Sequence, residues 1–144
     1  MATQNYTNHV RTVFGFHVVL AGIIVLTLIG SLINLYKCWG IHGQFYSAAL
    51  IVVLTICCGM LWAYTRIFPL KAQDRAIRAE ENLRHFALTG KLLDPRLTVY
   101  QIIALRFAPD DEFVNLARIA AESGMPPADI KRTVKNWKPD EHRV

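Results

Sequence analysis

Residues 16–36 read FHVVLAGIIVLTLIGSLINLY, and residues 45–65 read FYSAALIVVLTICCGMLWAYT. Neither stretch of 21 residues contains an Asp, Glu, Lys or Arg. At about 1.5 Å of rise per residue, each would form a helix roughly 32 Å long. This length matches the hydrocarbon core of a bilayer, which is about 30 Å thick. We therefore predict an all-α protein that contains a transmembrane helical hairpin, followed by a soluble helical domain.

Two other interpretations of these stretches fit less well. A soluble protein would have to bury both helices, and the rest of the 144-residue chain is too small to do so. A cleaved signal peptide has an apolar region of about 7–15 residues followed by small residues. Here the first stretch is longer and Tyr-Lys-Cys-Trp occupies 36–39, so we interpret it as an uncleaved anchor.

The distribution of basic residues predicts the orientation of the hairpin. The connecting loop, 37–44, contains Lys37 alone, whereas the second span is followed by Arg66, Lys71, Arg75, Arg78 and Arg84. The N-terminal arm, 1–15, contains Arg11. Basic residues beside spans stay in the cytoplasm. We therefore expect both chain termini in the cytoplasm, and with them the helical domain of residues 66–144.

The net charge of +5 is distributed unevenly. All 11 acidic residues and 14 of the 16 basic residues lie from Arg66 onward, which gives that region a net charge of +3. A basic excess beside a bilayer favours contact with anionic lipid headgroups, whereas the interspersed acidic residues argue against nucleic acid. The candidate headgroup or phosphate contacts are Arg11, Lys131, Arg132, Lys135 and Lys138.

Several residues inside the spans have ordinary structural interpretations. His17 could ligate haem, but the second span has no histidine to pair with it, so we interpret it as an interfacial residue. The adjacent Cys57 and Cys58 are interpreted as small apolar residues. Gly59 and Ala63 allow close helix approach, either to the first span or to a second copy. Since neither span contains a charged residue, we do not expect transport.

A membrane-proximal helix is predicted over residues 69–89. Its small and apolar residues recur at spacings of four and three, which places them on one face of the helix; they are Ala72, Ala76, Ala79, Leu83 and Phe86. We call this face the apolar stripe and treat it as the candidate interaction surface. It could meet the chain's own C-terminal part or a second copy of the protein.

The same helix contains Glu80, Glu81 and His85, which invite a metal or acid–base interpretation. Glu81 and His85 alone supply two ligands, and no third ligand is spaced to join them. The chain also has no recognisable nucleophile–base set or phosphate-binding loop. We therefore expect no enzymatic activity, no catalytic residue, no metal and no cofactor.

Three shorter helices are predicted near the C-terminus. Thr98 can cap a helix that runs to Phe107, and Asp110 or Asp111 begins the next, which Gly124 ends. Pro126 and Pro127 suit the first turn of the last helix, for which Ile130, Val134 and Trp137 form the expected buried face.

One spacing near these helices suggests an alternative function. Ala120, Gly124 and Ile130 have the spacing of a helix-turn-helix, in which Asp129, Arg132 and Asn136 would read base edges. The pattern is degenerate and describes many ordinary helical corners.

The run from Lys71 to Phe113, KAQDRAIRAEENLRHFALTGKLLDPRLTVYQIIALRFAPDDEF, and the ending DIKRTVKNWKPDEHRV carry a family resemblance. The chain resembles a family of small bacterial membrane proteins with two spans and a cytoplasmic tail, the domain of unknown function numbered 6526. The resemblance implies a bacterial inner membrane and brings no activity, cofactor or catalytic residue.

These observations together favour a membrane-anchored, non-enzymatic scaffold or interaction protein, such as an accessory subunit of a larger inner-membrane assembly. The expected partners are the lipid bilayer and either a second copy of the chain or a larger membrane complex. The alternative is a membrane-tethered regulator that binds nucleic acid through the helix-turn-helix spacing.

Overall fold

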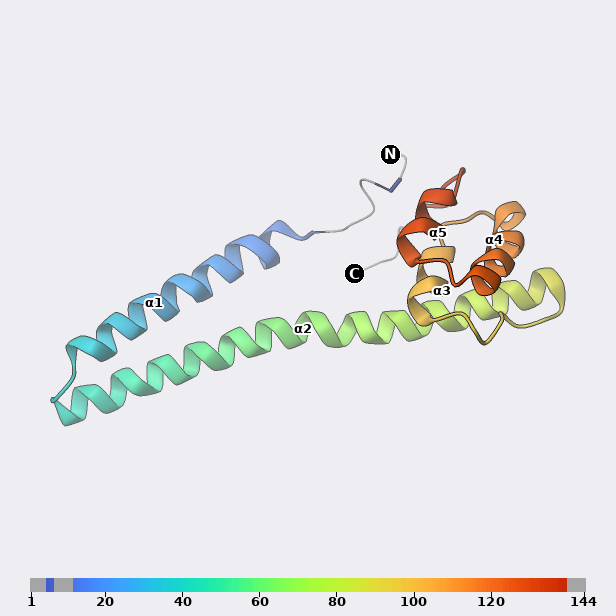
Figure 1. Ribbon diagram of the computed structural model, residues 1–144. Helices are drawn as coiled ribbons and strands as arrows, with labels where there is room; N and C mark the ends of the chain where they lie inside the picture. Colours follow the sequence, from blue (N-terminus) through green and yellow to red (C-terminus); the bar gives the residue numbers. More distant parts are fainter. Residues whose placement is uncertain (1–4, 7–11, 140–144) are drawn as a thin grey trace. The chain divides into compact units, whose positions relative to one another are not determined.

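The computed structural model describes residues 5–6 and 12–139, and these residues contain helices and no strand, as predicted. The elements are η1 (Gly15–Leu20, a π-helix), α1 (Ala21–Lys37), α2 (His42–Thr89), α3 (Val99–Leu105), α4 (Asp110–Ser123) and α5 (Pro127–Thr133), shown in Figure 1. The described residues form two compact units: residues 12–68 form one, and residues 5–6 and 69–139 form the other.

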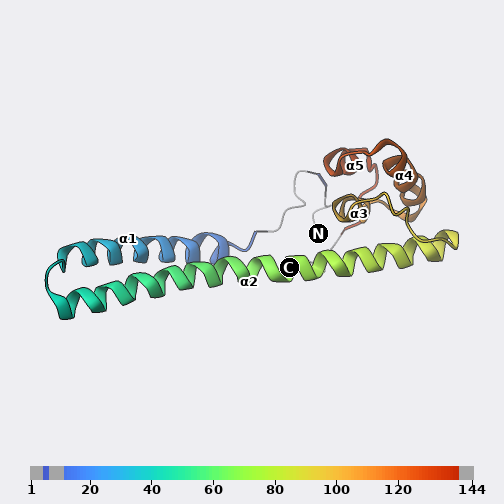
Figure 2. The same ribbon diagram turned by 60° about the horizontal axis from the view of Figure 1, so that its bottom comes forward.

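The first unit is an antiparallel hairpin of η1–α1 and the beginning of α2, which lie side by side in both views (Figures 1 and 2). Gly15–Lys37 and His42–Thr89 are long and apolar enough to cross a membrane, and they contain the two predicted spans. Large apolar side chains point outward on both helices; Leu26 is 71% exposed and Leu54 is 64% exposed. Such a surface suits a lipid environment.

Small side chains of α2 face α1 inside this hairpin. Ala48, Val52 and Thr55 are buried, and a Cβ atom placed on Gly59 would lie 3.7 Å from Ile24 Cγ2. Of the two partners considered for Gly59, the structure therefore supports the first span.

Polar groups inside the hairpin bond to backbone carbonyls. The Trp62 indole N–H donates to the Phe16 carbonyl at 2.9 Å, and the two rings are stacked with centroids 5.7 Å apart. The hydroxyls of Ser31 and Thr55 donate to carbonyls of their own helices, each at 2.8 Å. These bonds let the side chains lie in an apolar environment without an unpaired donor.

Helix α2 runs without interruption through Pro69. The sequence predicts a span that ends at Thr65 and a separate helix from Pro69, whereas the structure has one 48-residue helix from His42 to Thr89. Proline removes one backbone donor, the one that would reach the Thr65 carbonyl. The long helical stretches on both sides outweigh this loss. The prediction that a separate helix begins at Pro69 was therefore wrong.

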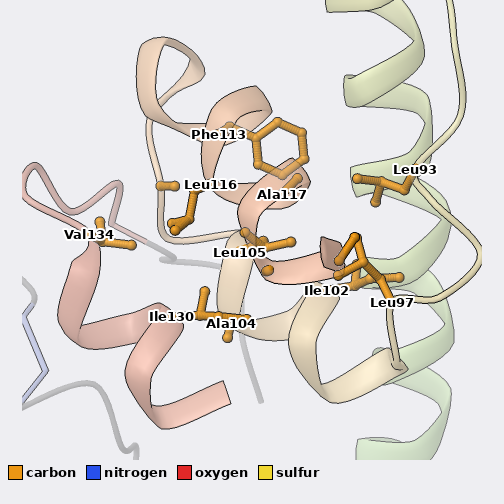
Figure 3. Close-up of a cluster of buried hydrophobic side chains, with 13 residues drawn as sticks. Leu93, Leu97, Ile102, Ala104, Leu105, Phe113, Leu116, Ala117, Ile130 and Val134 are labelled. Atoms are coloured by element: carbon orange, nitrogen blue, oxygen red, sulfur yellow. The ribbon is translucent and has the colours of Figure 1, made fainter. Parts of the chain in front are cut away.

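The second unit contains the rest of α2 and what we call the C-terminal domain, residues 90–139. Helix α3 packs against α4 and α5, and its core is drawn in Figure 3. The largest fully buried side chains are Phe107, Phe113, Leu105 and Ile130. These four come from α3, α4, α5 and the α3–α4 connection, so the core joins all three helices.

Local capping residues place the helix ends close to where the sequence predicts them. The Thr98 hydroxyl accepts from the Gln101 backbone N–H at 3.3 Å, and the Gln101 side chain accepts from the Thr98 N–H at 2.8 Å. This capping box begins α3 at the predicted residue. Gly90 and Gly124 follow α2 and α4 with φ of 73° and 63°, which favours glycine over other residues.

Helix α5 is shorter than predicted. It ends at Thr133, and Val134 is extended with ψ of 119°. The cause lies in α4, because the Glu112 carboxylate accepts from the backbone N–H groups of Lys135 and Asn136 at 2.9 and 3.1 Å. These two backbone N–H groups therefore cannot make the hydrogen bonds that would continue the helix.

The apolar residues that follow the end of α5 are nevertheless buried or packed. Val134 is buried, and the Trp137 ring lies 4.7 Å from the Phe107 ring, centroid to centroid. The Lys138 N–H donates to the Phe107 carbonyl at 2.8 Å. The expected buried face thus exists, although a non-helical segment supplies part of it.

Substitution of Phe113 tests the position of this core. We expect Phe113→Ala to lower the free energy of unfolding of the C-terminal domain by about 3–5 kcal/mol, because it leaves a cavity. Hydrogen exchange of α3 and α4 in detergent-solubilised protein measures the loss of protection. Tyr100→Ala is the matched control, since Tyr100 is 69% exposed, and equal losses in both variants would contradict the assignment.

Candidate interaction surface

The apolar stripe lies on the exposed face of α2. All five of its residues are exposed; Leu83 is 67% exposed and Phe86 is 50% exposed. The possibility that the stripe meets the chain's own C-terminal part is therefore wrong for the described residues. Exposed apolar side chains as large as Leu83 and Phe86 are typical of interaction surfaces when they lie together, so the stripe remains the candidate site.

The C-terminal domain instead packs against the opposite face of α2, which carries Ile77, Glu81, Arg84 and His85. Ile77 and Glu81 are each only 7% exposed. The His85 ring lies 6.0 Å from the Phe113 ring in an edge-on arrangement, and the Asn82 side chain accepts from the Leu93 N–H at 3.2 Å. This face contains more charged than apolar residues, which is why periodicity of apolar residues did not find it.

Arg84 makes the main polar connection between α2 and the C-terminal domain. Its guanidinium donates to Asp110 at 2.7 Å, to the Ala108 carbonyl at 2.8 Å and to Glu81 at 3.1 Å. It also lies over the Phe113 ring, 4.3 Å from the centroid. Glu81 and Arg84 are three residues apart, a spacing at which charge pairs form on helix surfaces, but the Arg84 side chain is only 13% exposed.

Burial raises the pKa of the Glu81 carboxyl above its ordinary value, although Arg84 opposes this effect. Glu81 and His85 do not form a metal site in the structure. Glu81 pairs with Arg84, and the His85 ring nitrogen Nδ1 lies 2.7 Å from the Lys91 carbonyl oxygen. Within the described residues, no group of three or more His, Cys, Asp or Glu side chains is placed to hold a metal ion.

A cavity of about 540 Å³ lies between the end of α2, the connector to α3 and α4. Charged residues of both signs line it, namely Lys91, Asp94, Asp111 and Arg118. Asp94 is bonded to the Arg96 guanidinium, which lowers the pKa of this carboxyl to about 2. Arg118 is bonded to Glu122 at 2.9 Å, so both groups already have partners within the chain.

The predicted headgroup contacts do not share one helix face. Lys131 and Arg132 belong to α5, whereas Lys135 and Lys138 follow its end. Arg132 pairs with Asp129 at 3.0 Å and lies 5.2 Å from the Tyr6 ring centroid, and the Lys131 ammonium lies 5.7 Å from the Phe107 ring centroid.

The exposed residues Lys135 and Lys138 are the better placed for contact with anions, whereas Lys131 and Arg132 already contact groups of the chain. Arg11, the remaining predicted contact, lies outside the described residues.

The helix-turn-helix spacing corresponds to a real helical corner. Ala120 and Ile130 are completely buried, and Gly124 is left-handed. However, α5 has only seven residues. The Asp129 carboxylate bonds to Arg132, and the Asn136 amide donates to Glu112 at 3.2 Å, so these side chains are already engaged within the domain.

Comparison with protein families adds one assignment. The model of the family of unknown function DUF6526 matches residues 1–144. The chain belongs to this family. Comparisons with curated proteins and with solved structures found no match. Membership in DUF6526 agrees with the resemblance seen in the sequence and gives no activity to any of the residues described above.

Removal of the Arg84 guanidinium tests its role in holding the C-terminal domain. Arg84→Met is expected to cost about 3–5 kcal/mol of unfolding free energy, because Glu81 is left buried and unpaired. Arg118→Met is the control, since its exposed pair with Glu122 contributes only about 0.3–0.5 kcal/mol. Denaturant unfolding in detergent compares the two, and similar midpoints would contradict the role.

Glu81 gives a pH prediction of defined sign. The pKa of the Glu81 carboxyl is higher in the folded state than its unfolded value of 4.5. Its contribution to the free energy of unfolding is therefore fully present below pH 4.5 and is lost as the pH rises through the raised pKa. Relative to wild type, Glu81→Gln should therefore become more stable as pH rises from 4 to 7. Thermal unfolding of both proteins across this range measures it, and a constant difference would oppose the assignment.

Proposed function

We propose that this DUF6526 member is a membrane-anchored, non-enzymatic interaction protein, either a scaffold or an accessory subunit of a larger assembly. In this proposal the hairpin anchors it in the bacterial inner membrane. Both termini and the C-terminal domain lie in the cytoplasm. The basic residues that follow the second span support this orientation.

The observation that carries the proposal is the exposure of the apolar stripe on the face of α2 opposite the C-terminal domain. A helix that needed only to connect a span to a domain would place polar residues there. Leu83 and Phe86 instead present large apolar groups, which gain free energy when a partner covers them, at about 25 cal/mol per Å² of buried apolar area.

A second candidate function is a membrane-tethered regulator that binds nucleic acid. The buried Ala120 and Ile130 around the left-handed Gly124 favour it, whereas the short α5 and the internal bonds of Asp129 and Asn136 weigh against it. Full-length protein in nanodiscs should show no salt-dependent affinity for duplex DNA beyond that of empty nanodiscs. A steep salt dependence would favour this second candidate.

Photo-crosslinking in native membranes tests the first proposal. A benzophenone amino acid at Leu83 is expected to form a defined protein adduct, because the stripe is covered by a protein partner. The same amino acid at Tyr100, which is 69% exposed and lies in α3, is the control. The proposal fails if position 83 gives no more protein adduct than position 100.

A reporter fused after Val144 tests the orientation separately. An alkaline phosphatase fusion should be inactive and a fluorescent protein fusion should fluoresce, because the proposed cytoplasmic side is reducing. The reverse pattern would place the C-terminal domain outside the cytoplasm.

A further inference from the structure

The apolar stripe follows a heptad spacing, the sequence pattern of a coiled coil. Its residues are separated by four, three, four and three positions, so they occupy alternating d and a positions of the heptad. Ala72, Ala79 and Phe86 are at d, whereas Ala76 and Leu83 are at a. In a coiled coil these positions form the seam that faces the partner helix.

The structure leaves this seam open to a second helix. Arg84 at position b, His85 at c and Asn82 at g contact the C-terminal domain, and Ile77 at b and Glu81 at f are buried. Positions b, c and f lie on the side of a coiled-coil helix that faces away from its partner, whereas position g borders the seam. The C-terminal domain therefore covers mainly the outer face of α2, and the side chains at positions a and d of the seam remain exposed.

The charges that flank the seam specify what kind of helix fits it. Arg75 is at position g and Glu80 is at position e, and both are exposed. Neither side chain forms a hydrogen bond or an ion pair with another side chain in the described part of the chain. In a parallel pair of helices, position g of one helix faces position e of the other five residues later. Arg75 of one copy would then face Glu80 of the other, twice by symmetry.

Other occupants of the seam match these charges less well. In an antiparallel pair, position e faces e and g faces g, so Arg75 would face Asn82 or another arginine. A helix that lies on a lipid surface has basic residues on both borders of its apolar face. Here the acidic Glu80 lies on one border of the stripe. A second copy anchored in the same membrane also has the same orientation, as a parallel pair requires.

We propose that the occupant of the apolar stripe is a second copy of this chain. The two membrane-proximal segments of α2 pair in parallel and in register, with reciprocal Arg75–Glu80 ion pairs. The proposal rests on the function proposed above and names its partner. Three alanines make the seam weak in isolation, but both helices are already formed and both copies are confined to one membrane, which raises their effective concentration.

Cysteine cross-linking in native membranes tests the register. In a full-length protein with Cys38, Cys57 and Cys58 changed to serine, Ala72→Cys, Ala79→Cys and Phe86→Cys are introduced one at a time. Copper phenanthroline then oxidises the two thiolates of neighbouring copies to a disulfide, and the Cu(II) complex and oxygen accept the electrons. All three variants should give disulfide dimers, whereas Arg78→Cys, at position c of the same helix, should give few.

A charge exchange tests the ion pair in the Ala79→Cys background. Glu80→Arg alone and Arg75→Glu alone should each lower the dimer yield, by roughly threefold to tenfold, because like charges then meet across the seam. The double variant should restore it. Both residues lie outside the contacts with the C-terminal domain, so the single variants keep the fold. A double variant that fails to recover overturns the pairing.

The outcomes separate this inference from the proposed function. Dimers at positions 72, 79 and 86 with little at 78 support the parallel pair. Dimers at fewer than all three positions, or an equal yield at position 78, indicate another arrangement and overturn it. If none forms while the benzophenone at Leu83 still captures a different protein, the second copy is wrong and the interaction protein stands. If neither the disulfide dimer nor the protein adduct at Leu83 forms, both proposals are wrong.

Discussion

The contacts of Arg84 determine which side of α2 the C-terminal domain covers. Its guanidinium reaches Glu81, Asp110 and the Ala108 carbonyl and also covers the Phe113 ring. An arginine with this many partners requires the first turn of α4 to lie against one side of α2. The C-terminal domain therefore covers the polar side of the helix, and the opposite side, with the apolar stripe, stays exposed.

The hairpin and most helix ends could be predicted from the sequence because their causes are local. A stretch without charged residues that is long enough for a bilayer needs no tertiary information. The capping box of Thr98 and the left-handed glycine at 124 likewise act within a few residues. Pro69 misled the prediction because its local cost is smaller than the stability of the helical segments on both sides.

The remaining features depend on contacts between residues far apart in sequence. The end of α5 is fixed by Glu112, more than twenty residues earlier. The buried side of α2 was missed because Glu81 and Arg84 look like an exposed pair at helical spacing, and only the packing of Phe113 shows otherwise. The stripe itself was found, but apolar periodicity marks a covered face without saying what covers it.

The composition of the stripe bears on the kind of association it could support. Alanine buries little area, so a seam of Ala72, Ala76 and Ala79 contributes far less than one of leucines. Only Leu83 and Phe86, near the end of α2 that carries the C-terminal domain, add large apolar surface. On the proposed pairing, attraction would be concentrated beside the two domains and weakest near the spans. Such a seam suits a pair that forms in the membrane and separates readily, because confinement rather than buried area supplies much of the stability.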